Sequence, residues 1–329
     1  MTTYKGWRND NFSVPNNIYV GGSLFSSILD VPYQQVKIVA KSGAPYSTIT
    51  AAQTAITDNS SSKIYTVLVF PGEYDEALTL KDYVNIIAID QFNTYILRQV
   101  TDNGVPVHCN LKINIDNRQI DGTHGLYLAA ASVIHIEGNV KGSENSPASG
   151  GNGICNYSNG IITILNGNVF GGYGKWGGGN GIYNYSNGII TILNGDVIGG
   201  NSDASTGGHG IKNCSNGKVT ILNSKIISGC DKFGYYGKGI LNTSTGKILI
   251  KNGLITNPGT KVTDYPILGG DIVLENCTIF GNHANVFAIY AGEPKTVKCM
   301  NVWSNRDLHA NITNLIPGGF NVNSEVSLP

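Results

Sequence analysis

The segment NGICNYSNGIITILNGNVFGG, residues 152–172, is followed 28 residues later by NGIYNYSNGIITILNGDVIGG, residues 180–200. The copies differ at three positions, where Cys155 becomes Tyr183, Asn168 becomes Asp196 and Phe170 becomes Ile198. Self-similarity at a fixed period of about 20 to 50 residues is typical of stacked repeat architectures. The chain is therefore expected to form a solenoid.

Strands, rather than helices, are predicted to build each repeat. Five segments beginning with a turn glycine align: GIITILN from 160 and from 188, GKVTILN from 217, GKILIKN from 246 and GDIVLEN from 270. The second and fourth residues after the glycine are apolar in every copy, and this alternation is typical of β-strands. Two further inward columns come from GICN, GIYN, GIKN and GILN and from Val169, Val197, Ile226, Ile255 and Ile279. Three short strands per coil predict an all-β parallel β-helix.

Two columns of asparagine run through the same repeats. One column is Asn166, Asn194, Asn223, Asn252 and Asn276, and the other is Asn156, Asn184, Asn213 and Asn242. Asparagine tolerates left-handed backbone at a turn, and identical amides can bond to one another along a stack. Both columns are therefore expected to help keep like residues on like.

The repeat does not extend over the whole chain. We expect an extended N-terminal arm over residues 1–40 and a capping helix segment over 41–64. The β-helix with its corner loops is predicted over 65–283, and a closing segment that breaks the repeat over 284–329.

The capping helix is predicted in YSTITAAQTAITDN, residues 46–59. Ser47 or Thr48 can cap its start, and Ile49, Ala52 and Ile56 share one face. A solenoid's terminal coil exposes its edge and core, so this helix is expected to cover the N-terminal end.

Charge is sparse and balanced, with 22 Lys and Arg against 22 Asp and Glu in 329 residues. Binding to nucleic acid or to a lipid surface requires clustered basic residues, so neither is expected as a partner. The first residues contain no apolar signal-peptide core, which predicts synthesis in the cytoplasm without a signal peptide. Six cysteines without a CxxC pair are interpreted as reduced structural thiols, and no metal or cofactor is expected.

The N-terminal part resembles a known superfamily. VAKSGAPYSTITAAQTAI (39–56) and YTVLVFPGEYDEALTLKDYVNIIAI (65–89) are similar to the opening of pectin methylesterases and of the wider pectate-lyase-like superfamily. In these proteins a small helix precedes the first strand and a GxYxE motif, which Gly72, Tyr74 and Glu76 match. The resemblance implies a right-handed parallel β-helix.

The resemblance does not extend to the esterase motifs of the types QAVA, DFIFG and LGRPW, which this sequence lacks. Similar β-helices with an N-terminal arm look like tailspike, fibre and decoration proteins of viruses and bacteriophages. The first hypothesis is therefore a viral structural protein that resides in the virion. Its arm, 1–40, would bind other virion proteins, and its surface would contact host polysaccharide. The alternative is a polysaccharide-degrading enzyme: a glycoside hydrolase, a lyase or a pectin-esterase-like protein.

The densest polar cluster, NIDNRQIDGTHG, supplies the catalytic candidates Asp116, Asp121 and His124, together with Arg118. Two carboxylates could serve glycoside hydrolysis if they face one groove about 5 to 9.5 Å apart. The competing interpretation is a solvated coil edge. His124 and His209 also align with Asn152, Asn180 and Lys238, which is typical of a turn position.

Four loops are predicted to interrupt successive coils at one corner. They are GSENSPASGG (142–151), GGYGKWGGG (171–179), GGNSDASTGG (199–208) and SGCDKFGYYG (228–237). Insertions on one side form a shared surface, which here carries Tyr173, Trp176, Phe233, Tyr235 and Tyr236. These aromatic residues suit stacking on glycans or packing on a partner protein, unless they fold back over the coil.

The outward positions of the two near-identical coils are unusually apolar. Contiguous apolar patches usually mark interfaces. We therefore expect the protein to bind itself, and the resemblance to viral β-helices implies a homotrimer with parallel axes. The expected contact includes Ile161, Leu165, Ile189, Leu193 and Leu222. A flanking loop covering this patch is the alternative.

Overall fold

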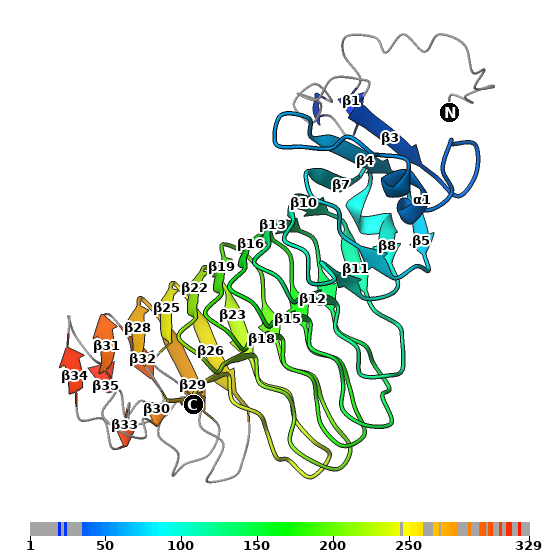
Figure 1. The fold of residues 1–329 in the computed structure, drawn as a ribbon. Helices are drawn as coiled ribbons and strands as arrows, with labels where there is room; N and C mark the ends of the chain where they lie inside the picture. The colour runs from blue at the N-terminus through cyan, green and yellow to red at the C-terminus, as the bar shows by residue number, and fades with distance from the viewer. Residues whose placement is uncertain are drawn as a thin grey trace.

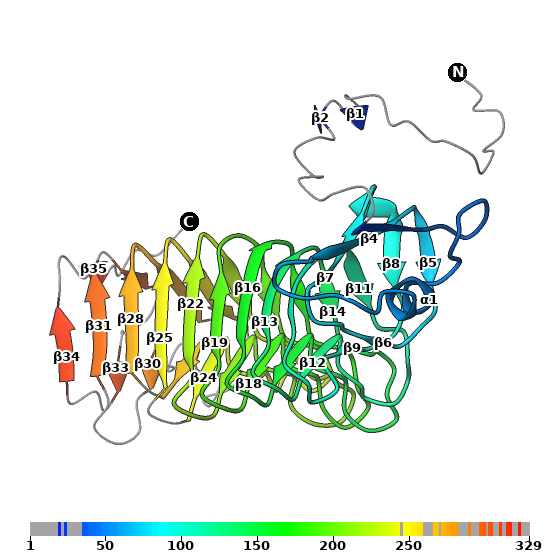
Figure 2. The ribbon, with the colours of Figure 1, turned by 45° about the horizontal axis from the view of Figure 1, so that its top comes forward.

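The computed structural model describes residues 19–20, 23–24, 35–243, 246–258, 266–269, 271–281, 289–290, 296–300, 302–304, 309–310, 314–317 and 322–323. In these residues the chain winds into a right-handed parallel β-helix with three sheets of 12, 11 and 10 strands (Figure 1). Each coil adds one strand to each sheet, as the sequence predicted. Figure 2 shows the strands following one another along the axis.

The 12-stranded sheet is called sheet 1. It consists of β3 (Val36–Val39), β4 (Tyr65–Val69), β7 (Val84–Ala88), β10 (His108–Lys112), β13 (Val133–Glu137), β16 (Ile161–Asn166), β19 (Ile189–Ile192), β22 (Lys218–Leu222), β25 (Lys247–Lys251), β28 (Asp271–Glu275), β31 (Thr296–Met300) and β34 (Asn314–Pro317).

The 11-stranded sheet is called sheet 2. It consists of β5 (Gly72–Tyr74), β8 (Thr94–Ile96), β11 (Asn114–Asp116), β14 (Val140–Lys141), β17 (Val169–Phe170), β20 (Val197–Ile198), β23 (Lys225–Ile227), β26 (Leu254–Asn257), β29 (Thr278–Gly281), β32 (Trp303–Ser304) and β35 (Val322–Asn323).

The 10-stranded sheet is called sheet 3. It consists of β6 (Leu78–Thr79), β9 (Val100–Thr101), β12 (Leu126–Leu128), β15 (Ile154–Asn156), β18 (Ile182–Asn184), β21 (Ile211–Asn213), β24 (Ile240–Asn242), β27 (Ile267–Leu268), β30 (Ile289–Tyr290) and β33 (His309–Ala310). Outside the three sheets lie β1 (Tyr19–Val20) and β2 (Ser23–Leu24), which pair antiparallel, helix α1 (Ile49–Thr54) and a short 3-10 helix (Gln91–Asn93).

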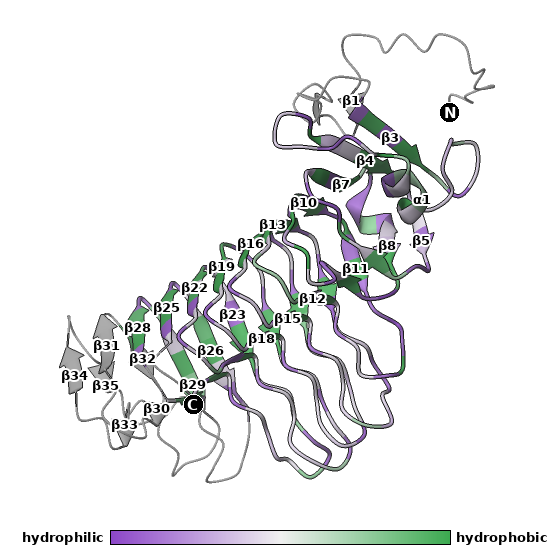
Figure 3. Ribbon diagram, viewed as in Figure 1, coloured by the Kyte–Doolittle hydropathy of each residue, from purple (hydrophilic) through white to green (hydrophobic). Residues whose placement is uncertain are grey.

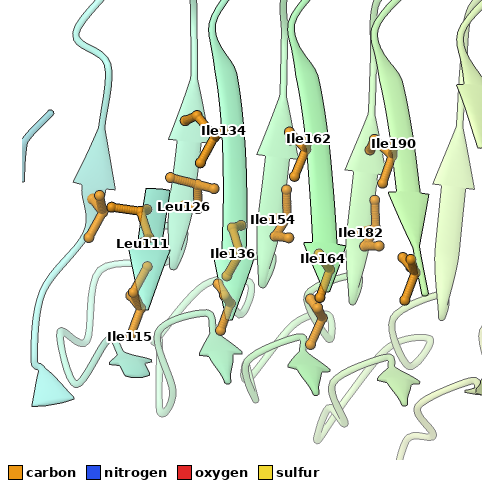
Figure 4. Packing of buried hydrophobic residues seen from close by; sticks show 14 of the residues in the cluster. Leu111, Ile115, Leu126, Ile134, Ile136, Ile154, Ile162, Ile164, Ile182 and Ile190 are labelled. Atoms are coloured by element: carbon orange, nitrogen blue, oxygen red, sulfur yellow. The ribbon is translucent and has the colours of Figure 1, made fainter. Parts of the chain in front are cut away.

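The core consists of like residues stacked on like. Ile162 pairs in register with Ile190 in the next coil, and both are fully buried. Figure 4 shows the same arrangement for Ile134, Ile162 and Ile190 in sheet 1 and for Ile154 and Ile182 in sheet 3. Burying one such side chain contributes about 1.5–3 kcal/mol. The strands accordingly carry the hydrophobic colour in Figure 3, while the loops between sheets 2 and 3 are pale to hydrophilic.

The capping helix predicted from the sequence is α1. Thr48 caps it, accepting a hydrogen bond from the backbone nitrogen of Ala51 at 3.2 Å. Ile49, Ala52 and Ile56 are buried against the first coil. Helix α1 therefore covers apolar residues that the end of the solenoid would otherwise expose.

One asparagine column forms a continuous buried ladder. The amide nitrogen of Asn156 donates to Asn184 at 3.0 Å, and Asn184 donates to Asn213 at 2.9 Å. Asn213 in turn donates to Asn242 at 2.9 Å, and all four side chains are fully buried. Each coil is thus tied to the next by a side-chain amide as well as by its backbone.

The other asparagine column divides into two parts. Asn223, Asn252 and Asn276 adopt the left-handed backbone, each with φ of 52°, and their amides bond from coil to coil. The expectation is wrong for Asn166 and Asn194. There the next residue, Gly167 or Gly195, takes the positive φ instead.

Parts of the expected domain organisation lie outside the described residues. The arm, 1–40, is described only in short pieces, of which β3 already belongs to sheet 1. Of the closing segment, 284–329, β30 to β35 are described, and they continue the three parallel sheets beyond residue 283.

The five cysteines whose side chains are described are all free. Within the described part of the chain, no helix has the length and apolar character needed to cross a membrane.

Candidate functional site

Four glycine-flanked loops stack on one another at the corner between sheet 2 and sheet 3. They follow β14, β17, β20 and β23 and precede β15, β18, β21 and β24. Figure 1 draws them as the long green-to-yellow connections that project together from one side. Isolated parallel bridges join neighbouring loops, for example Ser146 with Gly174 and Gly174 with Ser202.

The base of these loops is a ladder of glycine backbones, here called the glycine neck. Gly172 donates its backbone N–H to Gly151 at 2.7 Å, Gly179 donates to Gly172 at 2.9 Å, and Gly200 donates to Gly179 at 2.7 Å. The same chain of bonds continues through Gly208, Gly229 and Gly237. Backbone hydrogen bonds therefore join the segment that leaves sheet 2 to the segment that returns to sheet 3 within each loop, and they also join each loop to the next.

Only glycine fits in this neck. A Cβ atom on Gly172 would lie 1.7 Å from the carbonyl oxygen of Ser143, and one on Gly179 would lie 2.0 Å from that of Gly151. These glycines are needed for close approach of backbones rather than for positive φ. Much of the chain's high glycine content thus holds the loops in place.

The loop tips present the aromatic residues expected from the sequence. Trp176 and Phe233 are 59% and 58% exposed, and Tyr235 is also exposed. Tyr173 and Tyr236 are partly covered, and a hydrogen bond to Asp203 raises the pKa of Tyr173. A lysine accompanies each of the most exposed rings: Lys175 lies 5.7 Å from the Trp176 ring centroid, and Lys232 lies 5.2 Å from that of Phe233.

A surface pocket of about 510 Å³ lies at the same corner on the first coils. Its lining consists of Asp75, Leu97, Arg98, Arg118, Gln119, Ile120 and Asp121. The structure therefore brings the candidate Asp121 together with Arg118. It also adds Asp75 and Arg98, which sequence reasoning missed because they belong to earlier coils without the repeat.

The carboxylates around the pocket are held by hydrogen-bond donors. Arg98 binds Asp75 at 2.6 Å, and this bond lowers the pKa of Asp75. Partial burial would raise the pKa of Asp121, but hydrogen bonds from the hydroxyl and backbone of Thr123 lower it overall. The candidate Asp116 lies outside the pocket lining, 2.9 Å from Arg118 and 3.8 Å from Lys141.

His124 is mostly buried in a turn column. Its Nδ1 lies 3.2 Å from the backbone nitrogen of Asn152, whose side-chain oxygen accepts the backbone N–H of Asn180 at 2.8 Å. Asn180 accepts from His209 in the same way, and Nδ1 of His209 accepts from Lys238 at 2.7 Å. Burial lowers the pKa of His124 to about 4 and that of His209 to about 3. Both imidazoles are therefore neutral acceptors near pH 7.

Four tyrosines form an aromatic surface on sheet 3, here called the tyrosine platform: Tyr127, Tyr157, Tyr183 and Tyr185. The Tyr157 and Tyr185 ring centroids are 4.9 Å apart, and Tyr183 lies within 5.9 Å of both. Tyr157 is 43% exposed and Tyr185 is 51% exposed. The sequence signal was NYSNG, present in both near-identical copies, where tyrosine follows an inward asparagine and must face outward.

The apolar outward positions expected from the sequence lie on sheet 1. Ile161 pairs in register with Ile189, and each is 39% exposed. Leu165, Leu193 and Leu222 are half-buried. They lie within one residue of the C-terminal ends of β16, β19 and β22. Lys218, in register with Ile189, ends this row of isoleucines toward the C-terminus.

No protein-family model matches the sequence. No curated protein matches it either. Among solved structures, the chain is similar to one titled "Crystal structure of pectate lyase Pel9A", with a TM-score of 0.42 and 15% sequence identity. The similarity covers 89% of this chain and 78% of that chain. The three parallel sheets wound coil upon coil make this chain a right-handed parallel β-helix protein.

Proposed function

We propose that the protein is a structural component of a virus or bacteriophage particle, in which the β-helix is a shaft that contacts host surface glycans through its corner loops. The observation that carries this proposal is the pairing of exposed aromatic rings with lysines at the loop tips, above a rigid neck. Aromatic faces stack on sugar rings, and lysines add donors and positive charge.

The glycine neck supports a binding role. Fixing a loop before its ligand arrives reduces the conformational entropy lost on binding. Trp176 and Phe233 lie on loops whose bases are hydrogen-bonded through Gly179 and Gly237. The rings therefore occupy defined positions along the shaft, at intervals set by the coil spacing.

Polysaccharide degradation is the second candidate, and the pocket lined by Asp75, Arg98, Arg118 and Asp121 favours it. Glycoside hydrolysis requires one carboxyl with a raised pKa as general acid. The pKa values of Asp75 and Asp121 are both lowered, and His124 is a neutral hydrogen-bond acceptor in a turn column. These protonation states favour binding over hydrolysis.

Self-association belongs to the same proposal. Sheet 1 presents Ile161 and Ile189 outward beside the half-buried Leu165, Leu193 and Leu222. We propose that this patch joins three copies with parallel axes, while residues 1–40 attach the shaft to other particle proteins. The corner loops lie between sheets 2 and 3, away from sheet 1, and should remain accessible in such a trimer.

Binding to a glycan panel tests this function, with polysaccharide cleavage assayed in parallel. Wild type should bind at least one cell-surface polysaccharide, and Trp176→Ala with Phe233→Ala should weaken that binding at least tenfold, since two stacking contacts are lost. Lys175→Gln with Lys232→Gln should weaken binding only to anionic glycans. Turnover abolished by Asp121→Asn would favour the enzyme instead. Mass spectrometry of purified particles from cells that express the chain should detect it.

A further inference from the structure

We infer that the tyrosine platform is a second glycan site, which takes a neutral pyranose polysaccharide lying along the axis of the β-helix. This inference rests on the proposed role in glycan binding. It adds a second binding surface, separate from the corner loops, and names the class of glycan that this surface binds. The platform contains Tyr127, Tyr157, Tyr183 and Tyr185 on sheet 3, whereas the corner loops carry Trp176 and Phe233.

The exposed rings of the platform are held by the core. Tyr157 and Tyr185 directly follow Asn156 and Asn184, which are fully buried members of the asparagine ladder. The backbone nitrogen of Tyr185 donates to Asn156 at 2.9 Å, and that of Tyr157 donates to Leu128 at 2.9 Å. The rings also contact one another at 4.9 Å between centroids. They are therefore preorganised, and little freedom is lost when a ligand stacks on them.

Amide groups accompany the rings at the same interval. The exposed residues Asn159 and Asn187 lie two positions after Tyr157 and Tyr185. Their side-chain oxygens accept hydrogen bonds from Ser186 and Ser215, each at 3.1 Å. Because the oxygen is engaged, the Nδ2 group of each amide can donate to a hydroxyl group of a ligand. Ring faces beside amide donors are suited to pyranose sugars, which present C–H faces and equatorial hydroxyls.

The same pair of exposed side chains recurs on the platform from one coil to the next. We therefore expect a ligand that is itself a chain of repeating units. The pair Tyr157 and Asn159 recurs one coil later as Tyr185 and Asn187, and successive strands lie about 4.8 Å apart. That spacing is comparable to the length of one pyranose unit, so a linear glycan along the axis can meet the same contacts at successive sugars. A short peptide or a single sugar would not use this repetition.

The charge around the platform favours a neutral glycan. The four rings and the two amides carry no charge at neutral pH. Lys212 lies 5.2 Å from the Tyr183 ring centroid and marks the side of the platform nearest the C-terminus. The difference from the loop tips is which ring the lysine accompanies: Lys212 lies beside the half-buried Tyr183, whereas Lys175 and Lys232 lie beside the two most exposed rings of the tips. The two surfaces should therefore prefer different glycans.

The experiment compares matched variants on neutral polysaccharides: mixed-linkage β-glucan, mannan and dextran in affinity gels. Tyr157→Ala with Tyr185→Ala should weaken binding to at least one of them at least tenfold. Tyr157→Phe with Tyr185→Phe should retain binding within about threefold, because the ring face makes the contact. Phe92→Ala, which removes an exposed ring outside both surfaces, should leave binding to that polysaccharide unchanged. Asn159→Ala with Asn187→Ala should weaken it.

A measurement on the wild-type protein guards against misfolded variants. Nitration of tyrosines, mapped by mass spectrometry, should decrease at Tyr157 and Tyr185 when the bound polysaccharide is present, and not at Tyr95, which lies on sheet 2.

Four results would overturn the inference. Unchanged nitration with saturating polysaccharide excludes the platform as the site. Neutral-glycan binding lost only in the Trp176 and Phe233 variant moves the site to the loops, and the proposed function then stands without this inference. A platform variant that loses self-association instead of glycan binding would show that a second copy of the chain occupies the platform. Absence of binding to every polysaccharide would reject both the inference and the proposed glycan role.

Discussion

The carboxylate of Glu76 accepts a hydrogen bond from the backbone nitrogen of Ile49 at 2.7 Å. Its other oxygen accepts from the nitrogen of Thr50 at 2.9 Å. The last residue of the GxYxE motif, two positions after the end of β5, thus holds the first turn of α1. Tyr74 of the same motif is buried and donates its hydroxyl to the carbonyl of Phe70 at 2.8 Å. In this chain the motif fastens the capping helix to the first coil.

Replacing Glu76 by Ala should destabilise the N-terminal end. The substitution leaves two backbone N–H groups at the start of α1 without their acceptor, at a cost of about 1–2 kcal/mol. Urea unfolding and the rate of proteolysis near residue 49 measure the effect. Glu73→Gln is the matched control, because Glu73 makes an exposed ion pair with Arg118, worth at most about 1 kcal/mol. Equal effects of the two variants would contradict the role of Glu76.

Replacing Asn184 by Leu should cost more, because it interrupts the buried ladder. Asn156 loses its acceptor and Asn213 loses its donor, and each buried unsatisfied group costs about 1–3 kcal/mol. We expect the free energy of unfolding to fall by about 2–4 kcal/mol. Urea unfolding monitored by circular dichroism measures this change. Asn194→Ala is the control at an exposed position, with an expected change below about 0.5 kcal/mol. A stable Asn184→Leu variant would mean that the ladder contributes little.

The glycine neck predicts a sharp contrast between neighbouring glycines. Gly179→Ala places a Cβ atom 2.0 Å from the Gly151 carbonyl oxygen, whereas Gly177→Ala meets no atom closer than 3.3 Å, the side-chain oxygen of Ser149. The first change should open the loops, and limited proteolysis should cut residues 171–179 at least tenfold faster than in wild type. Gly177→Ala should be cut at the wild-type rate. Similar cleavage of both variants would argue against close packing in the neck.

Acid should destabilise the protein through His124 and His209. Their pKa values in the folded chain are about 4 and about 3, below the ordinary 6.5, because both are buried. The unfolded chain therefore takes up protons first as the pH falls below 6.5, and stability is lost progressively down to about pH 3 to 4. Shifts of this size correspond to roughly 3 kcal/mol for His124 and roughly 5 kcal/mol for His209. Above pH 6.5 neither group should contribute a pH dependence.

His209→Asn tests this origin directly. Asn152 and Asn180 already serve as acceptors in the same column, so the substitution preserves the contact without a titrating group. The slope of unfolding free energy between pH 6.5 and 4 should decrease by about half, while stability at pH 7.5 should change by less than about 1 kcal/mol. An unchanged slope would assign the acid sensitivity to other groups.

Ile189→Lys with Leu193→Lys should separate the proposed trimer into monomers, as measured by light scattering at micromolar concentration. Both positions lie outward on sheet 1, so circular dichroism should remain that of the folded β-helix. Thr191→Lys, between them, tests whether the centre of the same face is also covered. A wild-type monomer at this concentration, or a double variant that remains oligomeric, would refute the interface.

The core of the solenoid could be predicted because its determinants repeat locally. Ile162 and Ile190 occupy equivalent positions in adjacent copies, and stacking follows from the period alone. The structure of the N-terminal coils was harder to predict. The coils before residue 125 share no clear repeat, so nothing in the sequence indicated that Asp75 and Arg98 would meet Arg118 and Asp121 in one pocket. Only the stacking of three different coils creates that neighbourhood.

Glycine was the least informative residue at the sequence level. Paired glycines in a sequence are typical of tight turns, which usually require positive φ. The structure uses Gly172, Gly179 and Gly200 instead where backbones approach too closely for any side chain. Such close approach depends on the neighbouring coil and leaves no mark in the local sequence.

The neck is held together by backbone hydrogen bonds. The side chains at the loop tips, between its glycines, therefore do not contribute to the core. Tyr173, Lys175 and Trp176 can change in identity without disturbing a core side chain, whereas Gly174 stays fixed, because a Cβ atom there would lie 2.1 Å from the backbone nitrogen of Gly150. The residues that build the β-helix must therefore be kept for folding, whereas the side chains at the loop tips are free to diversify. In the proposed glycan-binding role, the binding segments could then be exchanged one loop at a time, while the β-helix beneath them stays the same.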